Sequence, residues 1–221
     1  MALCDTLDEQ KLLEELIDEG KPRRPAAAAR LHYLLATPFR YRPVRHGSRF
    51  RGPNDPGVYY AADAVRTACA ELGYWRWRHL ADSPSLDAMP VKPQTVFRAR
   101  LAASALDLRK PPFAAERARW TDRDDYAACQ ALARVARAGK VQAIRYESVR
   151  DPRHEACVAL LDPAGFAKPA PLEQQTWMLA VTRERVRWTR THALRDETFD
   201  FPADAWRGPA PKRAAKRMRR R

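Results

Sequence analysis

The sequence lacks the features of a membrane-spanning, secreted or metal-binding protein. No apolar run approaches the roughly 20 residues that a helix needs to cross a bilayer. The N-terminal stretch is acidic and amphipathic, unlike the basic and then apolar layout of a secretory signal. The four cysteines form no CxxC pair, and the five histidines show no metal-ligand spacing. We therefore expect a cytoplasmic protein with no disulfide framework, no bound metal ion and no contact with a membrane.

Glycine is scarce, with 8 residues against 18 prolines, and both are spread over the whole length. No low-complexity segment or internal repeat stands out. A chain of 221 residues suits one medium domain with extensions and is long enough to bury a substantial core. We expect an acidic N-terminal extension and linker at residues 1–29, a globular domain at residues 30–205, and a basic, disordered tail at residues 206–221.

Acidic residues are absent from the last ten residues, KRAAKRMRRR, which carry seven basic groups. This segment supplies half of the formal net charge of +14, so the rest of the chain carries +7. A block of like charges is usually disordered. A weak contact with RNA or DNA, a contact with an acidic partner and a tail without function all stay open, because net charge alone decides little about partners.

The spacing of apolar residues predicts a mixture of helices and strands. Leucines and an isoleucine between residues 12 and 17 indicate a first helix that ends at Gly20. A short helix from Arg30 is expected to stop before Pro38, and the segment from there to Pro56 has too many prolines and glycines for a regular element. The expected strands cover residues 57–61, 95–101, 141–146 and 156–161, with a hairpin at 177–181 and 186–189.

Two longer helices are expected between these strands. Thr121 would cap one of them, which continues through Arg137 and closes at Gly139. Asp63 would cap the other, which runs to about Arg78 and buries apolar residues at three- and four-residue spacing: Val65, Ala68, Cys69, Leu72 and Trp75. The order of elements shows no βαβ rhythm. It favours an α+β fold with a compact mixed sheet core and flanking helices over a doubly wound sheet.

Four polar or aromatic residues stand at the junctions of these elements. Arg49 follows a Gly-Ser turn, Tyr60 ends an apolar strand, and Glu71 lies on the next helix, with eleven residues from each to the next. Ser148 lies where a strand gives way to the turn SVRDP. Taken singly, each residue has an ordinary explanation: a surface arginine, a core tyrosine, an acid paired with an arginine at a helix edge, and a turn-forming serine.

The joint pattern resembles the RES-domain family, which is named for its Arg, Glu and Ser residues. Family members show, in this order, a GxR-aromatic turn, a YxA strand end and an AxxE helix. These read here GSRF at residues 47–50, YAA at 60–62 and ACAE at 68–71. The family's later serine matches Ser148, and its upstream arginine–tyrosine pair matches Arg40 and Tyr41. The resemblance covers roughly residues 31–201.

The resemblance implies an ADP-ribosyltransferase-like fold that consumes NAD and releases nicotinamide. NAD is then a substrate rather than a permanently bound cofactor, and inorganic phosphate, water or a protein side chain is the acceptor. The resemblance also implies the toxin of a bacterial toxin–antitoxin pair, neutralised by a helix-turn-helix antitoxin that covers the active site. The choice of acceptor and the formation of a homo-oligomer stay open.

Cleavage of the nicotinamide–ribose bond builds positive charge on the ribose, as in glycosidase transition states. By the resemblance, the Glu71 carboxylate would stabilise that charge and hold a ribose hydroxyl. Tyr60, with Tyr41, would bound the nicotinamide or the ribose through an aromatic face. Ser148 would hydrogen-bond the ribose or the nicotinamide carboxamide.

The pyrophosphate of NAD calls for arginine, whose planar fork pairs two phosphate oxygens at once. The resemblance gives this role to Arg49, together with Arg40. Arg42, Arg45 and Arg51 lie close by in the sequence. The sequence therefore leaves open which of the five arginines contacts phosphate.

Two other functions stay open. The chain could transfer ADP-ribose to a protein, although no acceptor-recognition segment is evident. It could instead bind nucleic acid through the basic tail and the run YWRWR at residues 74–78, because arginines beside aromatic rings suit stacking on single strands. Against nucleic-acid binding, Trp75 falls on the expected buried helix face, and no known nucleic-acid-binding module is present.

Overall fold

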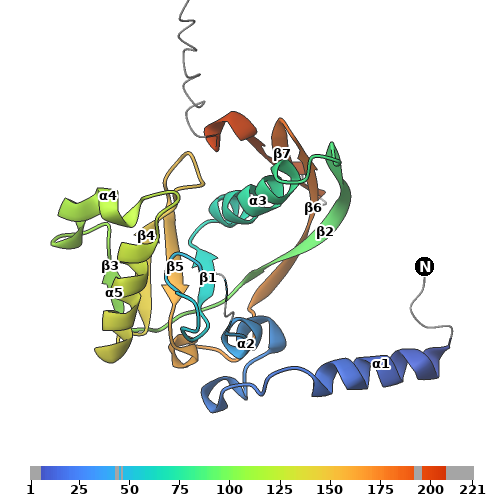
Figure 1. Cartoon of the computed structure of the whole chain (residues 1–221), viewed down its shortest axis with the longest axis horizontal. Coiled ribbons are helices and arrows are strands. Elements are labelled where there is room, and N and C mark those ends of the chain that lie inside the picture. The colour runs from blue at the N-terminus through green and yellow to red at the C-terminus, as the bar shows by residue number, and fades with distance from the viewer. Residues whose placement is uncertain (1–5, 43–44, 46, 192–195, 208–221) are drawn as a thin grey trace, which may run out of the picture. The chain divides into compact units, whose positions relative to one another are not determined.

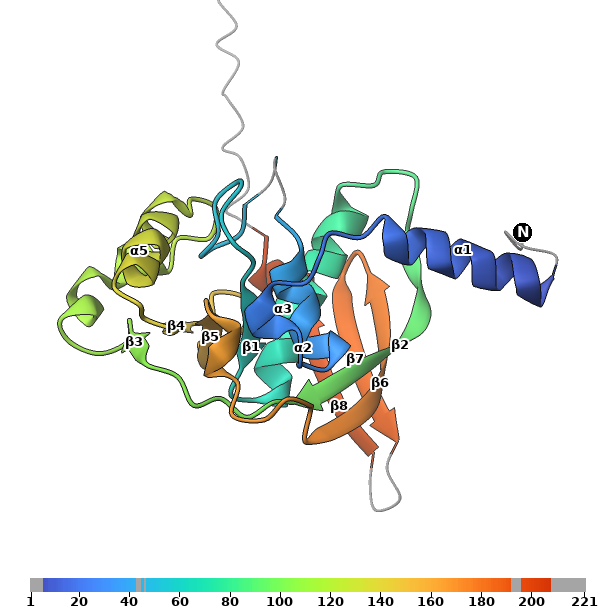
Figure 2. The ribbon, with the colours of Figure 1, turned by 90° about the horizontal axis from the view of Figure 1, so that it is seen from below.

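The chain folds into two compact units, each with one sheet and helices. The structure is a computed structural model that describes residues 6–42, 45, 47–191 and 196–207. Figures 1 and 2 show the elements of both units in two views. The predicted α+β class is confirmed. Unit 1 is built from the described residues within 1–63, 97–149 and 155–174, and unit 2 from the described residues within 64–96, 150–154 and 175–221.

Unit 1 contains a four-stranded sheet in the order β1-β5-β4-β3. Its strands are β1 (Tyr59–Ala62), β3 (Ala105–Asp107), β4 (Ala143–Glu147) and β5 (Ala156–Leu160). Its α-helices are α1 (Leu7–Glu19), α2 (Tyr33–Arg40), α4 (Arg117–Trp120) and α5 (Ala127–Ala138). Three 3-10 helices, at Ala26–Ala28, Phe113–Glu116 and Pro163–Gly165, complete its elements.

Both faces of the unit 1 sheet are buried. Ala159 and Ile144, which are paired across β5 and β4, face a core that includes Cys129 and Ala133 of α5. The neighbouring positions along the same strands face a second core that includes Leu35 and Phe39 of α2. This two-sided burial follows from the alternation of side chains along a strand. It explains why residues 156–160 read as a continuous apolar run, ACVAL.

The strand directions bring three carboxyl ends to one edge of this sheet. β1 and β4 both pair antiparallel with β5, and β3 pairs parallel with β4, so β1, β3 and β4 all run the same way. The register sets Ala62 and Tyr146 level with Cys157. The residues that follow β1 and β4 therefore leave the sheet at the same edge.

Unit 2 places one long helix against a second sheet, in the order β2-β6-β7-β8. The strands are β2 (Ala88–Arg98), β6 (Glu173–Thr182), β7 (Arg185–Thr191) and β8 (Asp196–Pro202), and the helices are α3 (Val65–Ala81) and a 3-10 turn at Ala203–Ala205. The core is rich in large aromatic rings from the sheet and from α3, which include Trp77, Trp177, Trp188 and Phe201. Gly73 allows α3 to approach the sheet closely, since a Cβ at this position would lie 3.0 Å from Cγ1 of Val186 on β7.

Several expectations from the sequence are confirmed. The predicted hairpin is present, because β6 and β7 pair antiparallel with Val181 opposite Val186. The strands expected at residues 141–146 and 156–161 correspond to β4 and β5. Cys69, Cys129 and Cys157, which lie in apolar stretches of the sequence, are buried. Burial raises the pKa of Cys69 to about 12, so this residue stays a thiol at neutral pH.

The prediction of which face of α3 is buried was wrong by part of a helical turn. Leu72 and Trp75 are 39% and 52% exposed, whereas Tyr74 and Trp77 are buried against the sheet of unit 2. The helix is apolar on more than one side, so spacing alone could not select the face that packs. Asp63 is not its cap either: the N-cap is Ala64, without a side-chain hydrogen bond, and Asp63 pairs with Arg145.

Two other helix boundaries differ from expectation. Pro38 lies inside α2 rather than beyond its end, and the burial of Leu35 and Phe39 compensates for the lost backbone hydrogen bond. Thr121 does not start α5, which begins at Ala127 after an irregular segment. Thr121 instead follows the end of α4, where its hydroxyl donates to the carbonyl of Arg117, the first residue of that helix. β3 and β8 were not anticipated, because each is short or mostly polar.

Leu160→Ala should destabilise the protein by about 2–5 kcal/mol, because Leu160 is fully buried and its loss leaves a cavity. Urea unfolding followed by circular dichroism measures the change. Leu172→Ala is the matched control, since Leu172 is 49% exposed. Equal free energies of unfolding for the two variants would contradict this account of the core.

Candidate functional site

A tight turn holds Arg49 at its tip. The backbone N–H of Ser48 donates to the carbonyl of Arg51 at 2.7 Å, and the return bond measures 3.1 Å. The hydroxyl oxygen of Tyr60 accepts from the N–H of Phe50 at 2.9 Å and lies 2.8 Å from Ser48 Oγ. The structure therefore brings the predicted residues Arg49 and Tyr60 together, with the tyrosine hydroxyl fastened to the turn that carries the arginine.

The Tyr60 hydroxyl is enclosed, although 37% of the residue surface remains exposed. Burial raises the pKa of the Tyr60 phenol above its usual value, against the opposing effects of the Ser48 and Phe50 hydrogen bonds and of the nearby charges of Arg51 and Arg49. The phenol therefore keeps its proton at neutral pH. Tyr60 thus combines a hydroxyl that is already hydrogen-bonded with a residue surface that is partly open.

The Arg49 side chain turns inward rather than into solvent. Only 7% of its surface is exposed, and Nη1 donates to the carbonyl of Trp120 at 2.9 Å. The guanidinium carbon lies 4.6 Å from the centre of the Tyr126 ring, within cation–π range. Arg49 thus connects the turn to the segment between α4 and α5, and it retains further N–H donors that a ligand could use.

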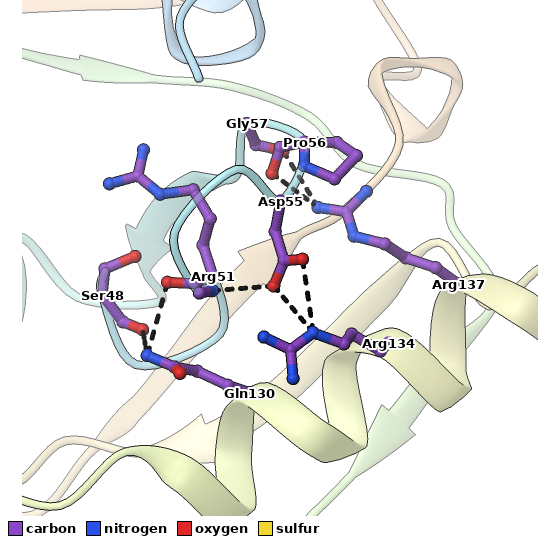
Figure 3. Close-up of polar contacts among 9 residues, drawn as sticks. Ser48, Arg51, Asp55, Pro56, Gly57, Gln130, Arg134 and Arg137 are labelled. Atoms are coloured by element: carbon purple, nitrogen blue, oxygen red, sulfur yellow. Dashed lines mark hydrogen bonds and ion pairs between the residues drawn. The ribbon is translucent and has the colours of Figure 1, made fainter. Parts of the chain in front are cut away.

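Side chains of helix α5 form hydrogen bonds with the turn and with the loop that follows it. Gln130, Arg134 and Arg137 are spaced for one helical face and all reach this loop (Figure 3). The amide of Gln130 donates to the carbonyls of Ser48 and Arg51, at 3.0 and 3.4 Å. A segment without regular structure therefore has its backbone satisfied by side chains.

Asp55 is the acidic member of this network. Its Oδ2 accepts from the N–H of Gly52 at 2.8 Å and from Arg134 Nε at 3.1 Å. Arg137 Nη2 donates to the carbonyls of Pro56 and Gly57, at 3.1 and 3.0 Å. Burial would raise the pKa of Asp55, but the hydrogen bonds from Arg134 and Gly52 and the nearby arginine charges lower it overall. The Asp55 carboxylate is therefore engaged in hydrogen bonds that stabilise the loop.

The other predicted residues of unit 1 lie at defined places. Ser148 is fully buried directly after β4, and its N–H donates to the carbonyl of Glu155 at 2.9 Å. It belongs to the same sheet edge as Asp63. Arg40 ends α2, where its Nε donates to the carbonyl of Pro22, and Tyr41 is 39% exposed.

Glu71 belongs to unit 2, where it is half-buried on α3. The first turn of α3 is fixed by Asp151, which is 1% exposed. The Asp151 carboxylate pairs with Arg66 and accepts from the Thr67 hydroxyl at 2.8 Å. Thr67 and Glu71 are one turn apart on the same face of the helix. Since Glu71 and Arg49 belong to different units, their convergence on one cleft stays a prediction.

The electrostatics of Asp151 suit the start of a helix. Burial alone would raise the pKa of Asp151, but the hydrogen bonds from the Arg153 N–H, Thr67 and Arg66 and the Arg66 charge together lower it. A carboxylate beside the first turn also compensates the positive end of the helix dipole. It replaces the side-chain cap that Ala64 cannot supply.

Sequence reasoning missed the residues that support the site. Asp151 lies in the segment SVRDP, which drew attention only for its serine. The spacing of Gln130, Arg134 and Arg137 is visible in the sequence, but arginines on a helix usually face solvent. No local signal indicated that Gln130 and Arg137 bind backbone carbonyls, and Arg134 the Asp55 carboxylate, far away in the chain.

In the ranges that the structure describes, no helix is both long and apolar enough to cross a membrane. The same residues contain no group of three or more histidine, cysteine, aspartate or glutamate side chains arranged to hold a metal ion.

Comparison with protein-family models matches residues 22–182 to the RES domain. The chain belongs to the RES-domain family. RES domains are associated with enzymes that act on NAD and with toxins. The match confirms the resemblance and includes the Arg49 turn, α3, α5 and Asp151, while α1 and the basic tail fall outside it. No curated protein matches the sequence.

Tyr60→Phe should lower the free energy of unfolding by about 1–2 kcal/mol, because Ser48 and the Phe50 N–H both lose a partner. Tyr33→Phe is the matched control, since Tyr33 is 59% exposed. Urea unfolding compares the two variants of the RES protein. No difference between them would show that the tyrosine hydroxyl does not hold the turn.

Asp151→Asn should destabilise the protein by about 3 kcal/mol at pH 7, because Arg66 loses a buried anionic partner. The folded pKa of Asp151 is lowered, so its stabilising effect is present above the unfolded pKa of about 3.9 and is lost as pH falls through the folded value. The gap between wild type and variant should therefore shrink below about pH 4.

Thermal unfolding from pH 7 to pH 3 measures this pH dependence. Asp82→Asn is the control, because Asp82 forms an exposed pair with Arg78 in the same unit. A gap that stays constant across the acid range would contradict the assigned ionisation of Asp151.

Proposed function

We propose that this RES-domain protein cleaves the nicotinamide–ribose bond of NAD, as an NAD phosphorylase or glycohydrolase. The observation that carries the proposal is the family match over residues 22–182. That range contains every residue to which we assign a role in the reaction: Arg40, Tyr41, Arg49, Tyr60, Glu71 and Ser148.

The proposed chemistry centres on the carboxylate of Glu71. The C–N bond breaks with its electron pair staying on the nicotinamide nitrogen, which was a pyridinium and needs little help from an acid. Positive charge develops on the ribose, and a carboxylate fixed beside it lowers the barrier. An oxygen of phosphate, or of water with release of a proton, then forms the new bond to the ribose carbon.

The surroundings of Glu71 support this role. It is half-buried, so its charge is less screened than that of a surface carboxylate. The Asp151 contacts hold the first turn of α3, one turn before Glu71. A carboxylate that is held in place before the reaction stabilises developing charge without reorganisation.

The binding roles are assigned to residues of unit 1 through the family match. Tyr60 has its hydroxyl engaged and part of its surface open, which suits an aromatic wall for the nicotinamide or the ribose. Ser148 is assigned to a ribose hydroxyl or the carboxamide, and Arg49, with Arg40, to the pyrophosphate. Tyr41 bounds the same ligand from its exposed position after α2.

We also propose that the protein is a cytoplasmic bacterial toxin, neutralised by a helix-turn-helix antitoxin. Family membership supports this role, since RES domains are associated with toxins. Removal of cytoplasmic NAD would arrest growth. Induced expression should therefore stop growth and lower cellular NAD, and the antitoxin partner should restore both.

Glu71→Gln keeps the side-chain shape and removes the charge, so we expect kcat for nicotinamide release to fall about 100- to 1000-fold. The assay incubates the purified protein with NAD, with and without phosphate, and follows nicotinamide and the ADP-ribose product. Glu184→Gln is the matched control, because Glu184 is exposed in the turn between β6 and β7. Unchanged release by Glu71→Gln would contradict the assignment.

The same assay separates the alternatives. Turnover only with phosphate identifies a phosphorylase, and turnover without it identifies a glycohydrolase. ADP-ribose attached to protein identifies a transferase. Absence of turnover together with salt-sensitive retention on nucleic acid favours a binding protein. Trp75 is exposed rather than buried, so its position does not argue against nucleic-acid binding.

A further inference from the structure

The arginines near the turn differ in what their guanidinium groups meet. Arg49 is bound to the Trp120 carbonyl and the Tyr126 ring, and Arg40 is bound to the Pro22 carbonyl. Arg42 and Arg45 are exposed. Arg51 alone combines a buried Nε with no hydrogen-bond partner among the residues that the structure describes. This contrast separates it from its four neighbours.

The backbone of Arg51 is held in place. Its N–H donates to the carbonyl of Ser48, and its carbonyl accepts from the Ser48 N–H and from the Gln130 amide. Figure 3 shows its side chain leaving the loop on the side away from α5, opposite to Gln130 and Arg134. An arginine on a fixed backbone loses less conformational freedom when a ligand binds.

The charge of Arg51 has no carboxylate in its own loop to pair with. Asp55, the only acid of residues 47–57, already accepts from Arg134 and the Gly52 N–H. A charged N–H that is buried without an acceptor is unfavourable, so a site of this kind favours a ligand that supplies one. The side chain also lies close enough to Tyr60 for its charge to act on the phenol.

We propose that Arg51 binds a phosphate-type oxyanion. The planar guanidinium presents parallel donors that match two oxygens on one phosphorus atom. This inference rests on the proposed function, in which two such groups occur: the diphosphate of NAD and the inorganic phosphate acceptor. Arg49 also has a structural role, because it donates to the Trp120 carbonyl. Arg51 therefore supplies a phosphate contact beside that of Arg49.

Steady-state kinetics with NAD and phosphate varied separately distinguish the two sources. Arg51→Gln should raise the KM for one of them about 10- to 100-fold, as expected for loss of charge-assisted hydrogen bonds. A raised KM for NAD identifies the diphosphate, and a raised KM for phosphate identifies the acceptor. Arg51→Lys keeps the charge without the fork and should give a smaller increase. Arg45→Gln removes an exposed charge from the same segment and is the control.

Calorimetric titration with pyrophosphate and with inorganic phosphate gives a readout that does not depend on turnover. Wild type and Arg45→Gln should bind at least one of them, and Arg51→Gln should bind it about tenfold more weakly or worse. Melting temperature without ligand should be unchanged in Arg51→Gln, because no described partner is lost.

The two proposals fail in different ways. If Arg51→Gln keeps both KM values and both affinities within twofold of wild type, the Arg51 site is overturned while the NAD reaction stands. If wild type releases no nicotinamide but binds pyrophosphate through Arg51, the reaction is overturned and the oxyanion site stands. An adventitious effect of charge would weaken binding equally in Arg45→Gln and would overturn the site.

Discussion

The hydroxyl of Tyr60 is the contact on which the arrangement of unit 1 depends. The segment from residue 47 to 57 forms no regular element, so its backbone groups must be satisfied by side chains or remain unpaired. Tyr60 holds the turn from the strand side, and three side chains of α5 hold the rest of the loop from the helix side. Two elements that are distant in sequence thus give an irregular segment one conformation.

This support decides the direction of two neighbouring arginines. Arg49 is at the tip of the turn and packs its guanidinium against the Trp120 carbonyl and the Tyr126 ring. Arg51 is at the base, where Gln130 occupies its carbonyl and its side chain leaves on the other side. The pattern of the family draws attention to the first arginine. The second is marked by a buried Nε that has no hydrogen-bond partner among the described residues.

In unit 2, α3 is likewise held by a side chain from a distant segment of the chain. The helix that carries Glu71 begins at a residue without a capping side chain, and Asp151 from a distant segment satisfies its first turn. A capping group from outside the helix fixes its rotation as well as its start, because Thr67 is a side-chain partner on one face. In both units, then, residues of the proposed chemistry lie beside residues that act only by holding them.

Local sequence was sufficient to predict the elements whose short residue pattern favours one conformation. The continuous apolar run of β5, the hairpin of β6 and β7, and the glycine that closes α5 followed from local pattern, and so did the family, because its motifs are short and ordered. Long-range packing decided the rest. Three features depend on groups far away in the chain, whose contacts no local spacing encodes. They are which face of an apolar helix is buried, whether Pro38 ends α2, and which arginine buries an Nε that has no partner within the described ranges.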